Sequence, residues 1–312
     1  MESSQFEYIK VNPVVKSALR KGVPVVALET AVVTHGLPRP INFQLACEME
    51  DIIRQAGALP ASIGMVKGVV YGGLTREQIA YLAEVKTARK LSQRDFSSAI
   101  ATHSDGGTTV AGTAIIAHAI GISVFATGGI GGVHRDSEFD ISADLPILAK
   151  TPLIVVCAGA KAILDLPATV EYLETMGIPV LGFQTDEFPA FYSISSGLPV
   201  SQRVDTVEMV GDIARAHFGL GIKSAILVVI PPPADVAIPM NVIEEHIDKA
   251  IKDCHRAGIH GAATTPFLLA RMGELTDGRS LKTNLALLKN NARVAAEIAV
   301  ALARPIQHTI TG

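Results

Sequence analysis

Short runs of apolar, β-branched residues alternate along the chain with longer segments of helical periodicity. Each run is bounded by glycine, proline or polar residues, a pattern typical of strands that are buried on both faces. This alternation favours an α/β fold, and we expect a three-layer α/β/α sandwich with a largely parallel central sheet. The expected strands are Val23–Thr30, Ile122–Gly129, Pro152–Ala160, Ile178–Thr185 and Ser224–Pro233.

The segments between and after these strands carry the helical patterns. The chain has 312 residues, 48% of them hydrophobic, which is enough for a large buried core. Because no repeat or linker interrupts it, we expect one domain over residues 1–312. The expected helices are Phe43–Gly57, Arg76–Lys86, Thr109–Ile120, Lys161–Met176, Thr206–Phe218, Ile243–Ala257 and Leu281–Leu302.

The expected strands become polar or glycine-rich at their carboxyl ends. Glu29 and Thr30 end the first strand, Thr127 closes the second, and Lys161 follows the third. In parallel α/β sheets, ligands bind in a crevice outside the carboxyl ends of the strands. We therefore expect these side chains to share one crevice.

The charge pattern argues against a nucleic-acid surface, because the formal net charge is −3 and no long run of Lys or Arg occurs. Mean hydropathy is +0.35, and residues 106–133 carry no charged side chain. That stretch contains Thr108 and His118 and is broken by Gly121, so we expect a buried helix and strand in a soluble protein and no membrane span.

Cysteine usage and the N-terminal sequence indicate the compartment. The three cysteines, Cys47, Cys157 and Cys254, are odd in number and form no CxxC pair, as expected in a reducing environment. The N-terminal sequence MESSQFEYIK has no apolar segment of a secretory signal. We expect a cytoplasmic protein, with another reducing compartment such as an organelle as the alternative.

Two charged residues stand out in apolar surroundings. Lys161 in IVVCAGAKAIL is the only charge between Lys150 and Asp165. Loss of hydration lowers the pKa of such an amine and makes it a nucleophile; the alternative is a surface lysine in the first turn of a helix. Glu29 in VVALETAVVTHGLP can act as a general acid or base, or simply pair with a cation.

The segment ATGGIGGVHRDSEFDISADL (126–145) concentrates glycines, two cations and a carboxylate cluster that includes Asp136 and Glu138. Its glycines let backbone N–H groups approach an anion; the alternative is a tight turn. Neither GxGxxG nor GxxxxGK[ST] occurs. Asp140 is a hard oxygen ligand for Mg²⁺ or Mn²⁺. Alternatively, Asp140 or Ser142 caps a helix and Asp144 is its first-turn acid.

Two further polar features point to the same crevice. Lys90 in ARKLSQRDF suits a phosphate, although a solvated basic patch is the alternative. Asn284 and Asn291 lie on the same helical face as Leu281, Leu285 and Leu288. Asparagines on an apolar face must be hydrogen-bonded, either to the backbone or to a ligand.

Several motifs, taken in order, resemble one enzyme family over nearly the whole chain, the pseudouridine-5′-phosphate glycosidases. The resemblance implies reversible cleavage of pseudouridine 5′-phosphate to uracil and ribose 5-phosphate. It further implies an α/β/α fold, a homotrimer and a divalent metal, typically Mn²⁺. The motifs are VALET with HGLP, KLSQRD, GGTTVAGT, FATGGIGGVHR, FDISADL, VVCAGAKAILD, YLET.GIPV and TPFLLAR...LTDGRSLKTN.

The resemblance also implies individual roles. Lys161 would form the covalent intermediate, Glu29 would donate the proton, and Asp140 would bind the metal. Other residues would contact the substrate, some of them through its phosphate: Lys90, Val110, Thr127, His134, Ser142, Ala143, Asp144 and Asn284.

The chain departs from the family pattern at two positions, which puts substrate affinity in doubt. Ala31 follows ET where members often read EST, and Gln93 stands where SRRD has arginine. Two rival functions remain. A different Schiff-base enzyme on sugar phosphates, such as an aldolase, would use Lys161 without releasing uracil. A non-catalytic binding subunit would tolerate replacement of both Lys161 and Glu29.

Overall fold

The computed structural model describes residues 8–135, 140–259 and 264–304, and its centre is a mostly parallel sheet flanked by helices. This confirms the expected fold class. The main path of the sheet runs in the order β1 (Ile9–Val11), β4 (Val69–Gly72), β3 (Leu59–Val66), β2 (Val25–Leu28), β7 (Val124–Ala126), β9 (Ile154–Cys157), β13 (Ile226–Val229), β11 (Val180–Phe183) and β12 (Gln202–Val204).

The strands from β3 to β12 along this path are parallel to one another. Each of the five expected strands contains one of them. Strands β2, β7, β9 and β13 are buried along their whole length because helices cover both faces. The register pairs Leu28 with Ala126 and Ala126 with Val156, so β2, β7 and β9 end side by side.

The sequence patterns missed the antiparallel part of the sheet. Strand β3 pairs antiparallel with β4 through a two-residue turn, Lys67 and Gly68, whose φ angles are 48° and 77°. Strand β3 also pairs antiparallel with β6 (Gly106–Thr108), which lies parallel to β5 (Arg89–Leu91). A separate pair, β8 (Val133–His134) and β10 (Leu164–Asp165), follows the main sheet strands β7 and β9.

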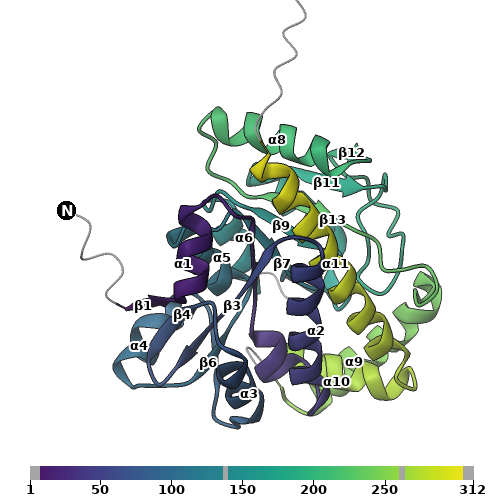
Figure 1. Ribbon diagram of the computed structural model, residues 1–312. Helices are drawn as coiled ribbons and strands as arrows, with labels where there is room; N and C mark the ends of the chain where they lie inside the picture. The colour runs from purple at the N-terminus through teal and green to yellow at the C-terminus, as the bar shows by residue number, and fades with distance from the viewer. Residues whose placement is uncertain (1–7, 136–139, 260–263, 305–312) are drawn as a thin grey trace, which may run out of the picture.

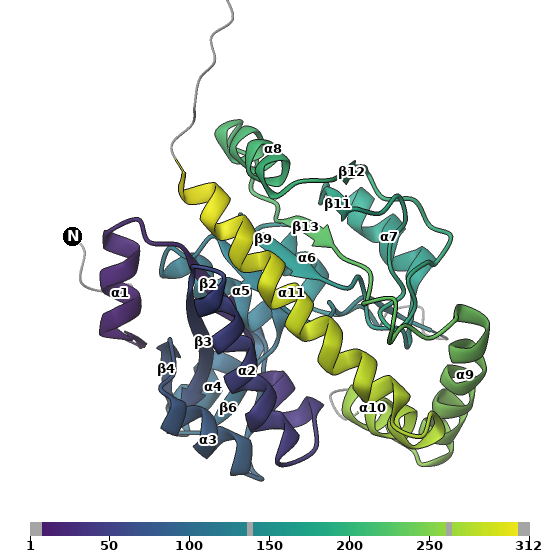
Figure 2. The ribbon, with the colours of Figure 1, turned by 45° about the vertical axis from the view of Figure 1, so that its right-hand side comes forward.

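Helices α2 (Ile41–Gln55) and α11 (Arg279–Ala303) lie on one face of the sheet, and α5 (Val110–Ala119) and α6 (Asp144–Leu148) lie on the other (Figures 1 and 2). Helix α11 packs on β7, β9, α2 and α8 (Val207–Gly219). The other helical segments are α1 (Pro13–Arg20), η1 (Val32–Gly36), α3 (Arg76–Glu84), η2 (Gln93–Asp95), α4 (Phe96–Ala101), α7 (Leu166–Thr175), α9 (Met240–Arg256) and α10 (Thr264–Leu275).

The uncharged stretch 106–133 forms β6, α5 and β7, as expected for a buried helix and strand. Helix α5 begins after Thr109, whose hydroxyl accepts a hydrogen bond from the Gly112 N–H at 3.2 Å. Within the described part of the chain, every helix is too short or too polar to cross a membrane.

One predicted helix is wrong at its start. The helix expected over 161–176 begins only at Leu166, where Asp165 caps it by accepting from the Ala168 N–H at 2.9 Å. Lys161 therefore lies in the turn between β9 and β10 and not in the first turn of a helix. The helical pattern of α7 continues in the sequence on the N-terminal side of Asp165, so the sequence does not show where the helix begins.

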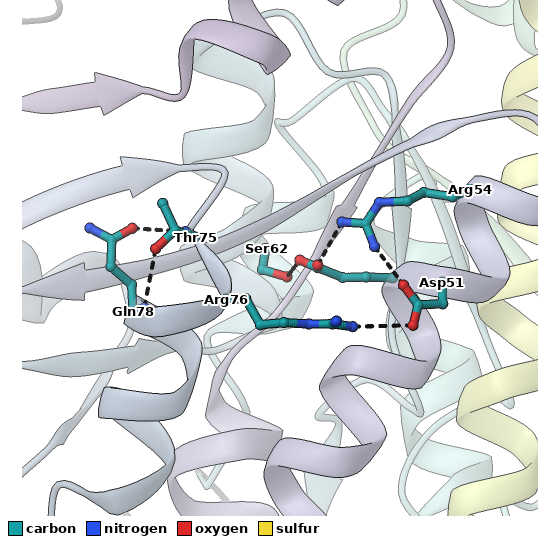
Figure 3. Close-up of polar contacts among 7 residues, drawn as sticks. Asp51, Arg54, Ser62, Thr75, Arg76 and Gln78 are labelled. Atoms are coloured by element: carbon teal, nitrogen blue, oxygen red, sulfur yellow. Dashed lines mark hydrogen bonds and ion pairs between the residues drawn. The ribbon is translucent and has the colours of Figure 1, made fainter.

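A polar network fastens α2 to its neighbours (Figure 3). The buried carboxylate of Glu50 accepts from the Ser62 hydroxyl of β3 at 2.7 Å and from Arg54 at 2.9 Å. Arg54 and Arg76 both donate to Asp51, at 2.8 and 3.1 Å, which links α2 to the start of α3. The network thereby fixes β3, the strand that pairs with β2 and supports Glu29.

Candidate active site

A cavity of about 480 Å³ lies at the carboxyl ends of β2, β7 and β9. It is lined by ten of the eleven residues predicted from the sequence: Glu29, Lys90, Val110, His134, Asp140, Ser142, Ala143, Asp144, Lys161 and Asn284. The eleventh, Thr127, is fully buried and does not line the cavity. The sheet and the helices packed on it thus bring together residues that are up to 255 positions apart in the sequence (284 − 29).

Glu29 follows β2 and is partly buried. The hydroxyl of Thr127, at the end of β7, donates a short hydrogen bond to its Oε1. Burial raises the pKa of the Glu29 carboxyl, while the charge of Lys161, the Thr127 hydrogen bond and the charge of Lys90 act in the opposite direction. Because burial outweighs them, Glu29 keeps its proton to higher pH than an ordinary glutamate, as a general acid requires.

Lys161 follows β9 in a tight turn. Its backbone N–H donates to the Ile130 carbonyl at 3.1 Å, and its own carbonyl accepts from the Leu164 N–H at 3.0 Å. The side chain reaches the cavity, where its charge lowers the pKa of Glu29. The Lys161 amine and the Glu29 carboxyl, with its raised pKa, can therefore act on the same bound molecule.

Two more basic side chains line the cavity. Burial lowers the pKa of the Lys90 amine and the charge of Lys161 lowers it further, whereas Asp144 and Glu29 raise it. Burial also lowers the pKa of His134, more than the nearby Asp140 raises it. His134 is therefore largely neutral near pH 7 and offers a hydrogen bond, not the full positive charge that the sequence suggested.

Asp144 organises the glycine segment. Its carboxylate is 5% exposed and accepts from the Ala111 N–H at the start of α5 and from the Gly131 N–H, each at 2.8 Å. Ser142 accepts from the Asp144 N–H at 3.2 Å, just before α6. Asp144 is indeed a first-turn acid, but its carboxylate stabilises the N-terminus of α5 rather than that of its own helix.

The glycine segment is tightly packed, and one of its predicted anion donors is already used. The Gly131 N–H donates to the Asp144 carboxylate, so it is not free to bind a phosphate. A Cβ at Gly131 would meet the Ser142 side chain, and one at Gly129 would lie 2.7 Å from the Phe191 ring. Gly128, Gly129 and Gly131 line the cavity, and at Gly129 and Gly131 the backbone passes too close to its neighbours for a side chain.

The two asparagines of α11 have different surroundings. The Asn291 amide donates to the Thr127 carbonyl at 2.8 Å and to the Gly128 carbonyl at 3.4 Å, so its main partner is the backbone. Asn284 is 7% exposed and lines the cavity, and its Oδ1 has no partner among the described residues. A buried acceptor without a partner, on a residue that lines a cavity, suits an N–H donor on a ligand.

Asp140 has the chemistry of a metal ligand in a water-rich site. Its side chain is 53% exposed, and its Oδ2 lies 3.9 Å from Nδ1 of His134. The described residues contain no cluster of three or more His, Cys, Asp or Glu side chains that could enclose an ion. Two members of the predicted carboxylate cluster, Asp136 and Glu138, lie outside the described residues. Mg²⁺ and Mn²⁺ keep several waters beside one or two carboxylates, so Asp140 fits such an ion.

The cavity contains residues that sequence reasoning did not assign. His35 lies in η1 with its Nδ1 2.7 Å from the Thr34 hydroxyl, and burial lowers its pKa. Arg94 lies in η2 and adds a cation. His35 belongs to the motif HGLP and Arg94 to the motif KLSQRD, so the family resemblance could have pointed to both residues. Phe191, held at φ 60°, had no signal in the sequence.

Comparison with known proteins identifies the family of this chain. The family described as indigoidine synthase A like protein matches residues 14–301. A pseudouridine-5′-phosphate glycosidase of Herpetosiphon aurantiacus is 51% identical over 93% of this chain and 96% of that protein. One of Solibacter usitatus is 49% identical over 95% and 99% of the two chains.

Two solved structures share the fold over 95% of this chain and 97% of theirs, each at 38% identity. One is an indigoidine synthase A-like protein of Thermotoga maritima, with a TM-score of 0.88. The other is a prealnumycin C-glycosynthase in complex with ribulose 5-phosphate, with a TM-score of 0.87. The chain therefore belongs to the indigoidine synthase A-like family, which it shares with proteins named pseudouridine-5′-phosphate glycosidase.

Proposed function

We propose that this protein reversibly cleaves the carbon–carbon glycosidic bond of pseudouridine 5′-phosphate, giving uracil and ribose 5-phosphate. The observation that carries the proposal is the meeting of Lys161 and Glu29 in one cavity, at the ends of β9 and β2, which lie on either side of β7. The names of relatives about 50% identical over most of the chain support the substrate. The sugar phosphate bound to a structural neighbour supports the same chemical class.

A lysine solves the main chemical difficulty of this reaction. An ordinary glycosidase protonates an oxygen leaving group, and a carbon–carbon bond has none. Electron donation from N1 of the uracil ring opens the ribose: C1′–O4′ breaks, C1′ becomes doubly bonded to C5, and the proton lost from N1 is balanced by the one that O4′ takes. The Lys161 amine then adds to C1′, the electron pair of the double bond returns to the ring, and the proton lost by the amine is balanced by the one that N1 regains. The bound amine can later form an imine, the intermediate suited to lysine.

Glu29 completes the cleavage. The C1′–C5 bond breaks as the Lys161 nitrogen forms a double bond to C1′, and uracil C5 receives the proton that Glu29 supplies. Water then adds to the imine and releases ribose 5-phosphate and the free amine. The raised pKa of the Glu29 carboxyl lets it keep the required proton to higher pH than an ordinary glutamate.

The remaining cavity residues hold the substrate in place. Lys90 and the His134 hydrogen bond are available to the 5′-phosphate, and Asn284 Oδ1 is available to an N–H of the uracil ring. Binding of these remote groups positions C1′ beside the amine. Asp140 would hold a divalent ion with its waters, whose positive charge would favour negatively charged oxygens of the substrate.

The test uses trapping with borohydride and ribose 5-phosphate. In the wild type, reduction of the imine should leave one ribose-phosphate adduct, on Lys161 and not on Lys90, detected by mass spectrometry. Lys161→Arg keeps the positive charge but cannot form the imine, so it should give neither adduct nor uracil. Glu29→Gln should still give the adduct while kcat falls about 10²- to 10⁴-fold.

These outcomes separate the proposal from its rivals. An aldolase would form the adduct but release no uracil from pseudouridine 5′-phosphate. A binding subunit would show no turnover in the wild type. Uracil release by Lys161→Arg at the wild-type rate would exclude the lysine mechanism altogether.

A further inference from the structure

Arg135 follows His134 in the sequence but does not line the cavity. Its side chain is 23% exposed and turns toward the segment that follows Lys161. The guanidinium donates from Nε to the Leu164 carbonyl at 3.1 Å and from Nη2 to the Ala162 carbonyl at 3.2 Å. Arg135 therefore binds the backbone one and three residues after the lysine.

The opposite edge of the same guanidinium is braced by α9. Nη1 and Nη2 of Arg135 donate to the two carboxylate oxygens of Glu244, at 2.9 and 3.1 Å. Asp248 lies one helical turn further, 3.7 Å from Nη1. A bidentate contact of this kind fixes the plane of the guanidinium as well as its position. The orientation of Arg135 is thus set by Glu244.

Few other hydrogen bonds hold the Lys161 turn. The Lys161 N–H bonds to the Ile130 carbonyl, and Leu164 pairs with His134 across the short strands β8 and β10. Among the described side chains, Arg135 alone donates to the carbonyls of Ala162 and Leu164. A lysine side chain has four rotatable bonds, so the placement of its amine depends on how firmly this backbone is held.

We propose that Arg135, braced by Glu244, is a positioning residue that holds the Lys161 turn so that the amine meets C1′ of the substrate. The inference rests on the proposed function, because it assigns Arg135 a role in the step that Lys161 performs. Arg135 touches neither substrate nor reacting atoms. Its contribution is to the rate of bond formation at Lys161 and not to the binding of the phosphate or of uracil.

The planar guanidinium is what this position requires. It presents donors along two edges at once, one toward the backbone carbonyls and one toward the carboxylate. A lysine ammonium carries the same charge on a single point and cannot span both partners. Arg135→Lys therefore removes the bridge while it preserves the local charge, which makes it the informative substitution.

The experiment compares Arg135→Lys, Glu244→Gln and their double variant with the wild type. The rate of borohydride-trapped adduct formation with ribose 5-phosphate is measured together with kcat and KM, per folded active site. Arg135→Lys should lower the trapping rate and kcat about 10- to 100-fold, with KM within about threefold of the wild type. Glu244→Gln should lower both rates about 3- to 10-fold. The double variant should be no slower than Arg135→Lys, because the two residues act through one contact.

Arg203→Lys is the matched control. Arg203 also bridges two chain segments, donating to Asp186 at 2.8 Å and to Asp205 at 2.9 Å, and it does not line the cavity. Arg203→Lys should change only the temperature of thermal unfolding and should leave the trapping rate unchanged. If Arg135→Lys does not fold, Glu244→Gln carries the same test.

The possible outcomes distinguish this inference from the function on which it rests. A wild-type trapping rate in both Arg135→Lys and Glu244→Gln, with the adduct still on Lys161, overturns the positioning role and leaves the proposed function intact. A large rise in KM with unchanged kcat also overturns it, since Arg135 would then act in binding. Failure of the wild type to form any adduct overturns the proposed function itself.

Discussion

The Thr127 hydroxyl donates a hydrogen bond to Oε1 of Glu29, and it does so across two neighbouring parallel strands. Asn291 of α11 donates in turn to the Thr127 carbonyl. Helix α11 therefore supports β7 at the point where Thr127 contacts the proposed acid. Burial raises the pKa of Glu29, while the charge of Lys161 and the hydrogen bond from Thr127 lower it.

The first prediction follows from these opposing effects. The hydrogen bond from Thr127 stabilises ionised Glu29 and lowers its pKa, while burial raises it. Thr127→Val removes the donor at nearly constant volume, so the pKa of Glu29 should rise further. Because the protonated acid is the active form, the alkaline limb of the kcat–pH profile should move to higher pH. Thr127→Ser keeps the hydroxyl and should keep the wild-type limb; an alkaline limb that moves down in Thr127→Val would contradict this account.

The second prediction concerns the phosphate. The net charge of −3 gives no long-range attraction for an anion, so its recognition must be local. A charge-assisted hydrogen bond contributes about 1.5–3 kcal/mol, or roughly 10- to 150-fold. Lys90→Ala should lower kcat/KM for pseudouridine 5′-phosphate by about this factor and leave the poor activity on unphosphorylated pseudouridine nearly unchanged. Equal losses on both substrates would show that Lys90 does not bind the phosphate.

The third prediction concerns the metal. Asp140 is half exposed and lies beside His134, a combination that suits an ion with several waters. A chelator should inactivate the wild type, and Mn²⁺ should restore it. Asp140→Asn should raise the Mn²⁺ concentration needed for half-maximal activity by at least about tenfold, without changing thermal unfolding of the metal-free protein. If the chelator left activity unchanged, the enzyme would need no metal and Asp140 would not be a metal ligand.

The fourth prediction concerns the packing of the glycine segment. A Cβ at Gly131 would lie 2.6 Å from Cβ of Ser142 and 2.8 Å from Oδ2 of Asp144. Gly131→Ala should therefore lower the free energy of unfolding by about 1–3 kcal/mol and impair activity. A Cβ at Gly219, at the exposed end of α8, would meet no atom within 4 Å, and Gly219→Ala should instead stabilise the fold by about 0.4–1 kcal/mol. Chemical denaturation measures both; a neutral Gly131→Ala would show that the segment can relax.

Much of the architecture was predictable because its signals are local. Buried parallel strands are continuous apolar runs, and all five expected strands are present. The boundary at Lys161 was not predictable, because the cap at Asp165 competes with a helical pattern that extends across it. The hairpin of β3 and β4 was missed because β3 contains Pro60 and Gly64, which usually argue against a strand.

The candidate site, like the fold, could be predicted only in part from the sequence. The motifs located Glu29, Lys161, Lys90 and Asp144 in the sequence, and the parallel order of the strands implied that the strand-end residues share a crevice. The sequence could not show that Asp144 accepts from Ala111 and Gly131, or that Thr127 lies behind Glu29 and not on the cavity wall. Those facts depend on side-chain directions that only long-range packing fixes.

The sequence by itself determined the fold class, the family and the residue types available for chemistry, because strand patterns and motifs are properties of short segments. Only the tertiary structure decided how these groups act on one another. Burial raises the pKa of Glu29 and lowers those of Lys90 and His134, and Arg135 reaches the backbone beyond Lys161 and not the cavity. The physical reason is that hydration, hydrogen-bond partners and electrostatic neighbours are set by residues distant in the chain, which become neighbours only when the sheet and its helices pack.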